Sequence, residues 1–175
     1  MPIHVLRHEQ RDPLDPLFYS PLTPAGLRGA EDLVATLSTL CIDVVYTSPF
    51  LRAVQTIYPF CKSHGQLMRV DHALYESLDN PLFGVDNSQY TWNELPTIYH
   101  GSIDADYVST CGSVPLRETF EQVCTRVRPF VRTLREKHGH LNVLLVTHLT
   151  TANAIRREWT GKCAADANRS EEHTS

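Results

Sequence analysis

Short apolar runs alternate with longer amphipathic stretches along the chain. Residues 43–46 and 142–146 are brief and rich in β-branched side chains, which favours buried strands. Residues 3–6 form a third strand candidate, although His4 interrupts the run, and residues 67–70 form a shorter fourth.

Two helix start signals lie in the first third of the chain. Thr23 is a favourable N-cap residue, and Pro24 suits the first helical position, before apolar residues that repeat at helical spacing up to Leu40. Ser48-Pro49 repeats this signal and predicts a second helix over the residues that follow.

Two further helices are expected near the C-terminal end. One covers about residues 116–137 and contains Pro129, which predicts a kink or a break. Four arginines of this helix are interpreted as its solvated face: Arg126, Arg128, Arg132 and Arg135. The other helix follows Thr147 and stops at Gly161.

Strands that alternate with helices predict an α/β domain: a mostly parallel central sheet between two helical layers, a three-layer α/β/α sandwich. The domain is expected to span residues 1–161. Within it, the pattern dissolves over residues 77–114, which predicts a lid or cap segment over a site. Residues 162–175 are polar and are expected to form a C-terminal tail.

Composition narrows the class of protein. Hydrophobic residues make up 42% of the 175 residues, and no apolar run is long enough for a membrane span or a secretory signal. The net charge of −4 offers no basic field for nucleic acid. Five cysteines without a C-x-x-C pair predict free thiols and a cytoplasmic location. The pattern leaves the oligomeric state open.

Arginines and histidines that could bind a ligand or take part in catalysis follow three of the predicted strands. Arg7 and His8 follow the first, Arg52 lies one helical turn after the second, and His148 follows the last. Because ligands of open α/β sheets bind beyond the carboxyl ends of the strands, we expect these side chains to converge.

Such a cluster suits a phosphoryl group. Guanidinium groups match phosphate oxygens, and a neutral imidazole among cations can attack phosphorus covalently. Neither a GxxxxGK[ST] nor a GxGxxG motif is present, so no nucleotide site is indicated. His4, His8 and His148 could be taken for a metal site, but four residues along a strand separate His4 from His8 by about 13 Å.

Five motifs in order resemble the histidine phosphatase superfamily, which has the phosphoglycerate mutase-like fold. They are Leu6-Arg7-His8, Leu22-Thr23-Pro24-Ala25-Gly26, Tyr46-Thr47-Ser48-Pro49-Phe50-Leu51-Arg52-Ala53-Val54-Gln55-Thr56, Leu74-Tyr75-Glu76 and Val146-Thr147-His148. The start Arg7-His8-Glu9-Gln10-Arg11 is most similar to the eukaryotic branch that contains the suppressor-of-T-cell-receptor-signalling phosphatases.

The resemblance implies a phosphatase that hydrolyses phosphomonoesters through a phosphohistidine on His8. Glu76 would protonate the leaving oxygen, and Arg7, Arg11, Arg52 and His148 would bind the phosphoryl oxygens. No metal ion or organic cofactor is implied. The expected partner is a small phosphorylated substrate or a phosphopeptide.

Two residues depart from the family pattern. Glu9 and Leu149 stand where the family usually has glycines, and their added bulk could slow or abolish turnover. Three alternatives therefore stay open: a catalytically impaired phosphate-binding relative, a phosphoglycerate mutase-type phosphoryl transferase, and a metal-dependent hydrolase.

Overall fold

The computed structural model describes residues 2–15, 17–77, 92–112 and 117–161. The elements in chain order are β1 (Ile3–Arg7), α1 (Pro24–Ser38), β2 (Val44–Thr47), α2 (Leu51–His64), β3 (Met68–Val70), the 3₁₀ helices η1 (His72–Leu74), η3 (Trp92–Glu94) and η4 (Thr97–Ser102), α3 (Phe120–Lys137), β4 (Val143–Thr147) and α4 (Leu149–Thr160). The predicted tail, 162–175, lies outside the described residues, as does a large part of the predicted lid.

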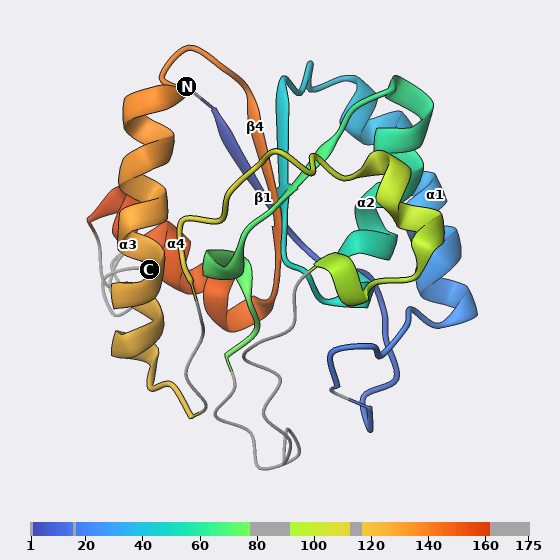
Figure 1. Ribbon diagram of the computed structural model, residues 1–175, viewed down its shortest axis with the longest axis horizontal. Coiled ribbons are helices and arrows are strands. Elements are labelled where there is room, and N and C mark those ends of the chain that lie inside the picture. The colour runs from blue at the N-terminus through green and yellow to red at the C-terminus, as the bar shows by residue number, and fades with distance from the viewer. Residues whose placement is uncertain (1, 16, 78–91, 113–116, 162–175) are drawn as a thin grey trace, which may run out of the picture.

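The described strands form a parallel sheet in the order β1-β4-β2-β3. Helices α1 and α2 lie on one side of the sheet and α3 and α4 on the other, so the predicted three-layer α/β architecture is confirmed (Figure 1). All five residues of β4 are buried, because this central strand is covered on both faces.

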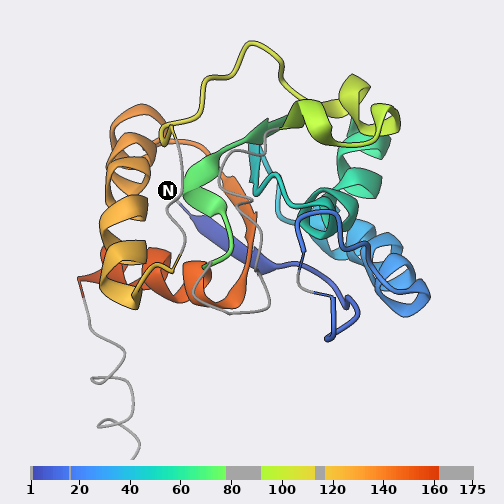
Figure 2. The same cartoon turned by 60° about the horizontal axis from the view of Figure 1, so that its bottom comes forward.

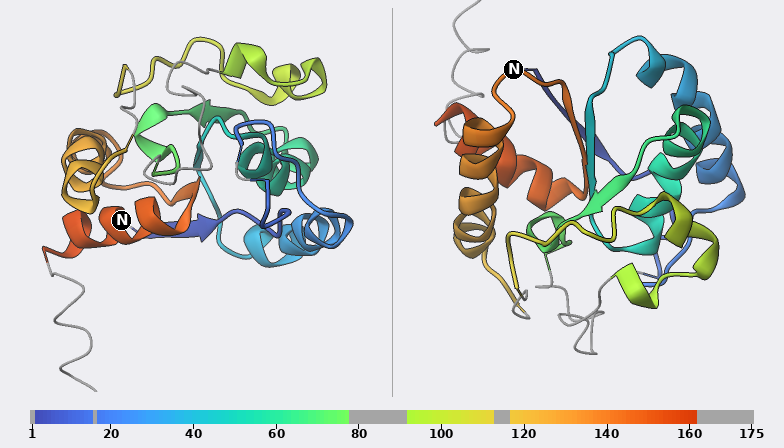
Figure 3. Two further views of the ribbon diagram at one scale, coloured as in Figure 1. Left: turned by 90° about the horizontal axis from the view of Figure 1, so that it is seen from below. Right: turned by 45° about the horizontal axis from the view of Figure 1, so that its top comes forward.

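Two apolar clusters fill the spaces between the layers. Val45, Leu144 and Val146 face the cluster that includes α2, whereas Tyr46, Val143 and Leu145 face the cluster that includes α3. Neighbouring residues of β2 and β4 thus alternate between the two helical layers, as the period of a strand requires. Because all paired strands are parallel, their carboxyl ends lie at one edge of the sheet. Figure 3 shows the helices on either side of the sheet in two further views.

The helix predictions hold with three corrections. α1 begins as expected, because Thr23 Oγ1 accepts a hydrogen bond from the Gly26 amide. α2, however, begins after Phe50 without a side-chain cap, so the predicted capping role of Ser48 is wrong. α3 begins at Phe120 rather than near residue 116, because Thr119 and Gln122 form a capping box there. It also continues through Pro129 as one helix, so the predicted break is wrong, whereas the predicted kink stays a prediction.

The fourth helix matches its prediction. α4 ends at Gly161, whose φ of 68° is the left-handed conformation that glycine adopts readily. Within the described residues, no helix is both long enough and apolar enough to cross a bilayer.

The described part of the predicted lid is packed rather than irregular. It contains η3 and η4, and its buried residues Leu95 and Ile103 belong to the apolar cluster around α2 (Figure 2). Ile103 also forms a parallel bridge with Met68 of β3, whose other neighbour in the sheet is Val45 of β2. This segment is therefore anchored along α2 and the edge of the sheet.

Candidate active site

The sheet register places the two histidines of the site side by side. β1 pairs with β4 so that Arg7 lies opposite Thr147, and the amide of His8 donates to the Thr147 carbonyl at 3.0 Å. The following residue on each strand is a histidine, and the ring centroids of His8 and His148 are 5.1 Å apart. The convergence that the strand ends predict is therefore present.

The His8 imidazole is buried and its tautomer is defined by one hydrogen bond. Nδ1 lies 2.7 Å from the Glu9 carbonyl oxygen, which can only accept, so Nδ1 carries the proton and Nε2 keeps its lone pair. Burial, followed by the proximity of His148, lowers the pKa of His8 to about 3. At neutral pH the ring is an unprotonated base and potential nucleophile.

Arg52 brings a buried positive charge to the site from the first turn of α2. Its side chain is fully buried, Nη1 donates to the Leu17 carbonyl at 2.9 Å, and the guanidinium lies 4.5 Å from the centre of the Phe50 ring. Burial lowers the pKa of Arg52 to about 10, which leaves the group charged at neutral pH.

Glu76 joins the cluster from the segment after η1. One of its carboxylate oxygens lies 3.6 Å from Nη2 of Arg52 and 3.3 Å from Nδ1 of His148. Burial raises the pKa of this carboxyl, but its interactions with His148 and Arg52 outweigh burial and lower the pKa to about 2. Glu76 is thus a carboxylate of the site and not the solvated surface residue that a lone glutamate usually is.

The His148 imidazole is fully buried and is oriented by Ser48, the residue that follows β2. Its Nε2 lies 2.9 Å from Ser48 Oγ, and burial lowers the pKa of His148 to about 4. Ser48 is a residue of this arrangement that sequence reasoning assigned to helix capping. The only sequence signal for its actual contact was its place in the motif that supplies Arg52.

Arg7 and Arg11 lie at the mouth of the site. Together with His8 they line a hollow of about 320 Å³, whose other lining residues are Glu9, Gln10 and Pro13. Nη1 of Arg11 donates to the backbone carbonyls of Asp12 and Asp15 at 2.5 and 3.3 Å. These two arginines therefore border the hollow, whereas Arg52 lies behind it in the buried cluster.

The two residues that replace family glycines adopt ordinary backbone conformations. Among the described residues other than glycine, only Cys41 and Arg117 have positive φ, so Glu9 and Leu149 need no glycine-like geometry. Leu149 is 53% exposed. The Glu9 carboxylate lies against Gly29 of α1, where an added Cβ would be 2.7 Å from Oε2.

A glycine is required at the start of α1. A Cβ on Gly26 would lie 2.2 Å from the Gln10 carbonyl oxygen, because the helix packs directly on the loop that follows His8. This close approach explains why the motif Leu22–Gly26 ends in glycine.

The site could accept a metal ion on donor geometry alone. One ligand atom each of His8, Glu76 and His148 lies within 4.8 Å of the others, a different trio from the His4, His8 and His148 considered from the sequence. The guanidinium of Arg52 lies against the same carboxylate, and Arg7 and Arg11 border the hollow. This surrounding positive charge favours an anion over a cation.

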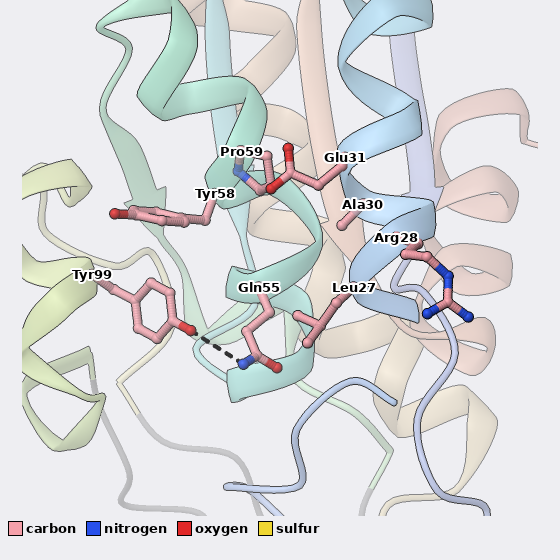
Figure 4. Close-up of a pocket in the computed structure, with 8 residues that line it drawn as sticks. All are labelled: Leu27, Arg28, Ala30, Glu31, Gln55, Tyr58, Pro59 and Tyr99. Carbon is pink, nitrogen blue, oxygen red and sulfur yellow. Dashed lines mark hydrogen bonds between the residues drawn. The ribbon is translucent and has the colours of Figure 1, made fainter. Parts of the chain in front are cut away.

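A second hollow, of about 310 Å³, lies between α1, α2 and η4 (Figure 4). Its walls include Leu27, Tyr58 and Tyr99, and the Gln55 amide donates to the Tyr99 hydroxyl at 3.1 Å. None of the predicted site residues lines it. The cluster around His8 is therefore the candidate active site.

Comparisons with known proteins identify the family of the chain and relatives of its fold. Residues 16–174 match the model of the histidine phosphatase superfamily (branch 1). The match starts after Arg7 and His8, so the position of these two residues rests on the sheet register described above.

A curated relative is "Putative phosphoserine phosphatase 2" of Hydrogenobacter thermophilus, which is 30% identical over 138 residues. The alignment covers 78% of this chain, and the chain spans 64% of that relative's length.

Solved structures share the fold at low sequence identity. The ecdysone phosphate phosphatase of Bombyx mori, determined with tungstate, has a TM-score of 0.67 and 17% identity over 89% of this chain and 76% of its own. A mycobacterial glucosyl-3-phosphoglycerate phosphatase complexed with inorganic phosphate has a TM-score of 0.67 and 22% identity, covering 93% and 80%. The alpha-ribazole phosphatase of Shigella flexneri has a TM-score of 0.67 and 21% identity, covering 97% and 84%. With its fold, its motifs and the match over most of its length, the chain belongs to the histidine phosphatase superfamily, branch 1.

Proposed function

We propose that the protein hydrolyses phosphomonoesters through a covalent phosphohistidine on His8. The observation that carries the proposal is the hydrogen bond from His8 Nδ1 to the Glu9 carbonyl, which leaves Nε2 unprotonated beside a buried arginine. A neutral imidazole with its second nitrogen held by a carbonyl is an activated and oriented nucleophile.

The phosphoryl group is bound by three arginines around His8 and by the neutral imidazole of His148. Arg52 and His148 contact its oxygens from the buried side, and Arg7 and Arg11 contact it from the mouth of the hollow. Charge that develops on the oxygens in the transition state is stabilised by groups that are already in place, which is usually a large part of catalysis.

Glu76 transfers the proton that the leaving oxygen needs. Despite burial, the nearby His148 and Arg52 lower the pKa of its carboxyl to about 2, so it is ionised. A bound phosphoryl group puts negative charge beside it, which raises the pKa of the carboxyl. A monoester that arrives as its monoanion supplies the proton, which passes to Glu76.

The reaction then proceeds in two steps. In the first, the Nε2 lone pair forms a bond to phosphorus, the bond to the leaving oxygen breaks, and Glu76 protonates that oxygen. In the second, water attacks phosphorus, Glu76 accepts the proton from water, and the electron pair of the N–P bond returns to Nε2. Inorganic phosphate is the product.

Phosphatase chemistry is preferred to two alternatives from the same superfamily. A mutase holds its phosphoenzyme until the group returns to a substrate, and the described residues offer no second cluster of phosphate-binding cations for this. An impaired phosphate-binding protein would follow if Glu9 and Leu149 blocked the site. The exposed position of Leu149 and the placement of Glu9 against Gly29 support activity instead.

Trapping the intermediate tests the proposal. The wild type, rapidly quenched after mixing with a ³²P-labelled monoester, is expected to carry an acid-labile, base-stable adduct and to release phosphate with or without a chelator. His8→Ala is expected to lose both the adduct and the hydrolysis. The matched control is His64→Ala, which removes an exposed histidine of α2 and is expected to behave as the wild type.

The alternatives predict different results. Binding of phosphate without an adduct or turnover would indicate the impaired relative. Transfer of the label to a phosphorylated acceptor in preference to water would indicate a mutase, and loss of activity with chelator would indicate a metal-dependent hydrolase. Hydrolysis by His8→Ala at the wild-type rate would refute the proposed nucleophile.

Within the superfamily, we place the chain in the eukaryotic branch of the suppressor-of-T-cell-receptor-signalling type. Arg11 at the mouth of the hollow and the Leu74-Tyr75-Glu76 motif support this placement. The substrate is a small phosphorylated compound or a phosphopeptide, and residues 77–114 act as the lid that selects it. A panel containing phosphoserine, a sugar phosphate and a phosphotyrosyl peptide tests this, and the ester with the highest kcat/KM identifies the substrate class.

A further inference from the structure

The backbone that leads to Glu76 is held by side chains from three other parts of the chain. The carbonyl groups of residues 72–75, in and just after η1, accept hydrogen bonds from Arg126, Thr147 and Thr151. Residues Ala73, Leu74 and Tyr75 are themselves fully buried. The position of the Glu76 carboxylate therefore depends on how these carbonyls are held.

Arg126 makes the largest number of these bonds. Its Nη1 donates to the carbonyls of Ala73 at 2.7 Å and His72 at 3.3 Å, and its Nη2 reaches the Tyr75 carbonyl at 3.5 Å. The sequence-based view of Arg126 as a solvated residue of α3 is wrong, because its side chain is only 4% exposed.

Glu118 holds Arg126 in this orientation. The two side chains form a bidentate ion pair, with Nε–Oε1 and Nη2–Oε2 distances of 2.7 Å, and the Glu118 side chain is 1% exposed. Just before it, Arg117 has a φ of 59°, in the left-handed region that residues other than glycine adopt infrequently.

Two threonines connect the same backbone to His148. Thr147 Oγ1 donates to the Leu74 carbonyl at 2.8 Å, and Thr151 Oγ1 donates to the Tyr75 carbonyl at 2.5 Å. Thr147 precedes His148 at the end of β4, and Thr151 lies in the first turn of α4. Residues before and after His148 in the chain are therefore bonded to the backbone that leads to Glu76. The His148 and Glu76 side chains lie 3.3 Å apart.

We infer that Arg126, oriented by Glu118, is a positioning residue that sets the place of the Glu76 carboxylate against the leaving group. The inference rests on the proposed function, in which Glu76 protonates the leaving oxygen. Proton transfer needs hydrogen-bond contact, and a displacement of about 1 Å in an active site can cost about 10²-fold in rate. A planar guanidinium reaches several carbonyls at once, whereas a lysine ammonium on a flexible stem does not reproduce this fork.

The test compares two leaving groups in Arg126→Lys. 4-Nitrophenolate leaves without a proton, whereas an alkoxide such as that of glycerol 1-phosphate needs one. We expect kcat/KM for the alkyl ester to fall at least tenfold more than kcat/KM for the aryl ester. The matched control is Arg128→Lys on the same helix, where the ion pair with Glu158 is exposed, and it should leave both values unchanged.

A second variant covers the case in which Arg126→Lys does not fold, which thermal melting followed by circular dichroism reveals. Thr151→Val keeps the shape of the side chain but removes the hydrogen bond to the Tyr75 carbonyl. It is expected to show the same selective loss on the alkyl ester, of smaller size.

Failure of the inference and failure of the proposed function give different results. An equal loss on both esters, or no loss, in a folded variant overturns the positioning role while wild-type activity and the loss in Glu76→Gln stand. If the wild type hydrolyses neither ester, or Glu76→Gln retains full activity on the alkyl ester, the proposed function itself fails and the inference fails with it.

Discussion

Two buried arginines on opposite sides of the sheet differ in how their charge is balanced. Arg126, from α3, forms a bidentate ion pair with Glu118 at 2.7 Å and donates to backbone carbonyls. Arg52, from α2, lies 3.6 Å from its carboxylate partner Glu76 and stacks over the Phe50 ring. One guanidinium is tightly matched to a single carboxylate, and the other shares a looser contact in a cluster with two histidines.

The difference separates a structural cation from one that can bind a ligand. A buried charge with short, bidentate partners has its desolvation cost offset within the protein and holds its neighbours in place. A buried charge with a longer contact gains further stabilisation when an anion arrives. Glu76 lies between the two arginines: Arg52 contacts its carboxylate, and Arg126 holds the backbone before it.

Replacing each arginine by methionine tests this comparison most strongly. Arg52→Met is expected to lower kcat/KM by about 10²–10³-fold, because a preorganised donor to the phosphoryl oxygens is lost. Arg126→Met is expected to lower the free energy of unfolding by about 3–5 kcal/mol, because Glu118 is left buried and unpaired. Denaturant titrations and steady-state kinetics on both variants check this. A larger loss of stability in Arg52→Met than in Arg126→Met would reverse the assignment.

Glu76→Gln removes the carboxylate that Arg52 contacts and that follows the backbone held by Arg126. The expected loss of kcat/KM on an alkyl phosphate is about 10²–10⁴-fold, because general acid catalysis is removed, with a much smaller loss on 4-nitrophenyl phosphate. The measurement is the ratio of the two values in wild type and variant. An unchanged ratio would show that Glu76 carries no proton to the leaving group.

The pH dependence of kcat/KM is expected to follow groups of the active site and not Arg126. With its pKa lowered to about 3, His8 stays a free base through mildly acidic pH. The proton-carrying monoanion of the substrate is lost above about pH 6. Therefore kcat/KM for an alkyl phosphate is expected to rise around pH 3, level off, and fall above pH 6. An acid limb near pH 6.5, typical of an exposed histidine, would contradict the lowered pKa.

The free energy of unfolding is also expected to depend on pH, through His8 and His148. Burial lowers the pKa values of His8 and His148 below that of an unfolded histidine, so between the folded and unfolded pKa values the unfolded chain binds more protons. The folded state therefore loses stability as pH falls from about 6.5 toward 4. Melting temperatures across this range check the sign.

The smallest effect is expected from restoring the family glycines. Glu9→Gly and Leu149→Gly should each change kcat/KM by less than about threefold, because neither side chain binds the phosphoryl group or transfers a proton in the proposed mechanism. The Leu149 side chain faces solvent, and the Glu9 carboxylate packs on α1. A gain of tenfold or more in either variant would mean that the native side chain impairs the site.

Much of the fold and the main site were predictable because they depend on local patterns. Short β-branched runs predicted all four described strands to within one residue at each end. The rule that ligands bind at the carboxyl ends of parallel strands predicts from the sequence that His8, Arg52 and His148 lie together. Membership of the superfamily, which the motifs indicated, was confirmed.

The roles of buried polar residues were not predictable from the same patterns. The arginines at 126, 128, 132 and 135 look alike in a helical sequence, yet only Arg126 lies over the carbonyls of η1, where Glu118 meets it. Ser48 carries a typical capping signal, but its hydroxyl contacts His148, 100 residues away. A hydrogen bond between distant residues has no period or spacing along the chain from which it could be read.

The sequence by itself thus determined which residues form strands and helices, where each strand ends, and which reactive side chains lie just beyond those ends. The tertiary structure alone decided which atoms face one another. The pairing of Arg7 with Thr147 brings the two histidines together, and α3 packs so that Arg126 reaches the backbone before Glu76. Amphipathic spacing directs a face toward the core, but the partner of a buried polar group depends on the register and packing of distant elements.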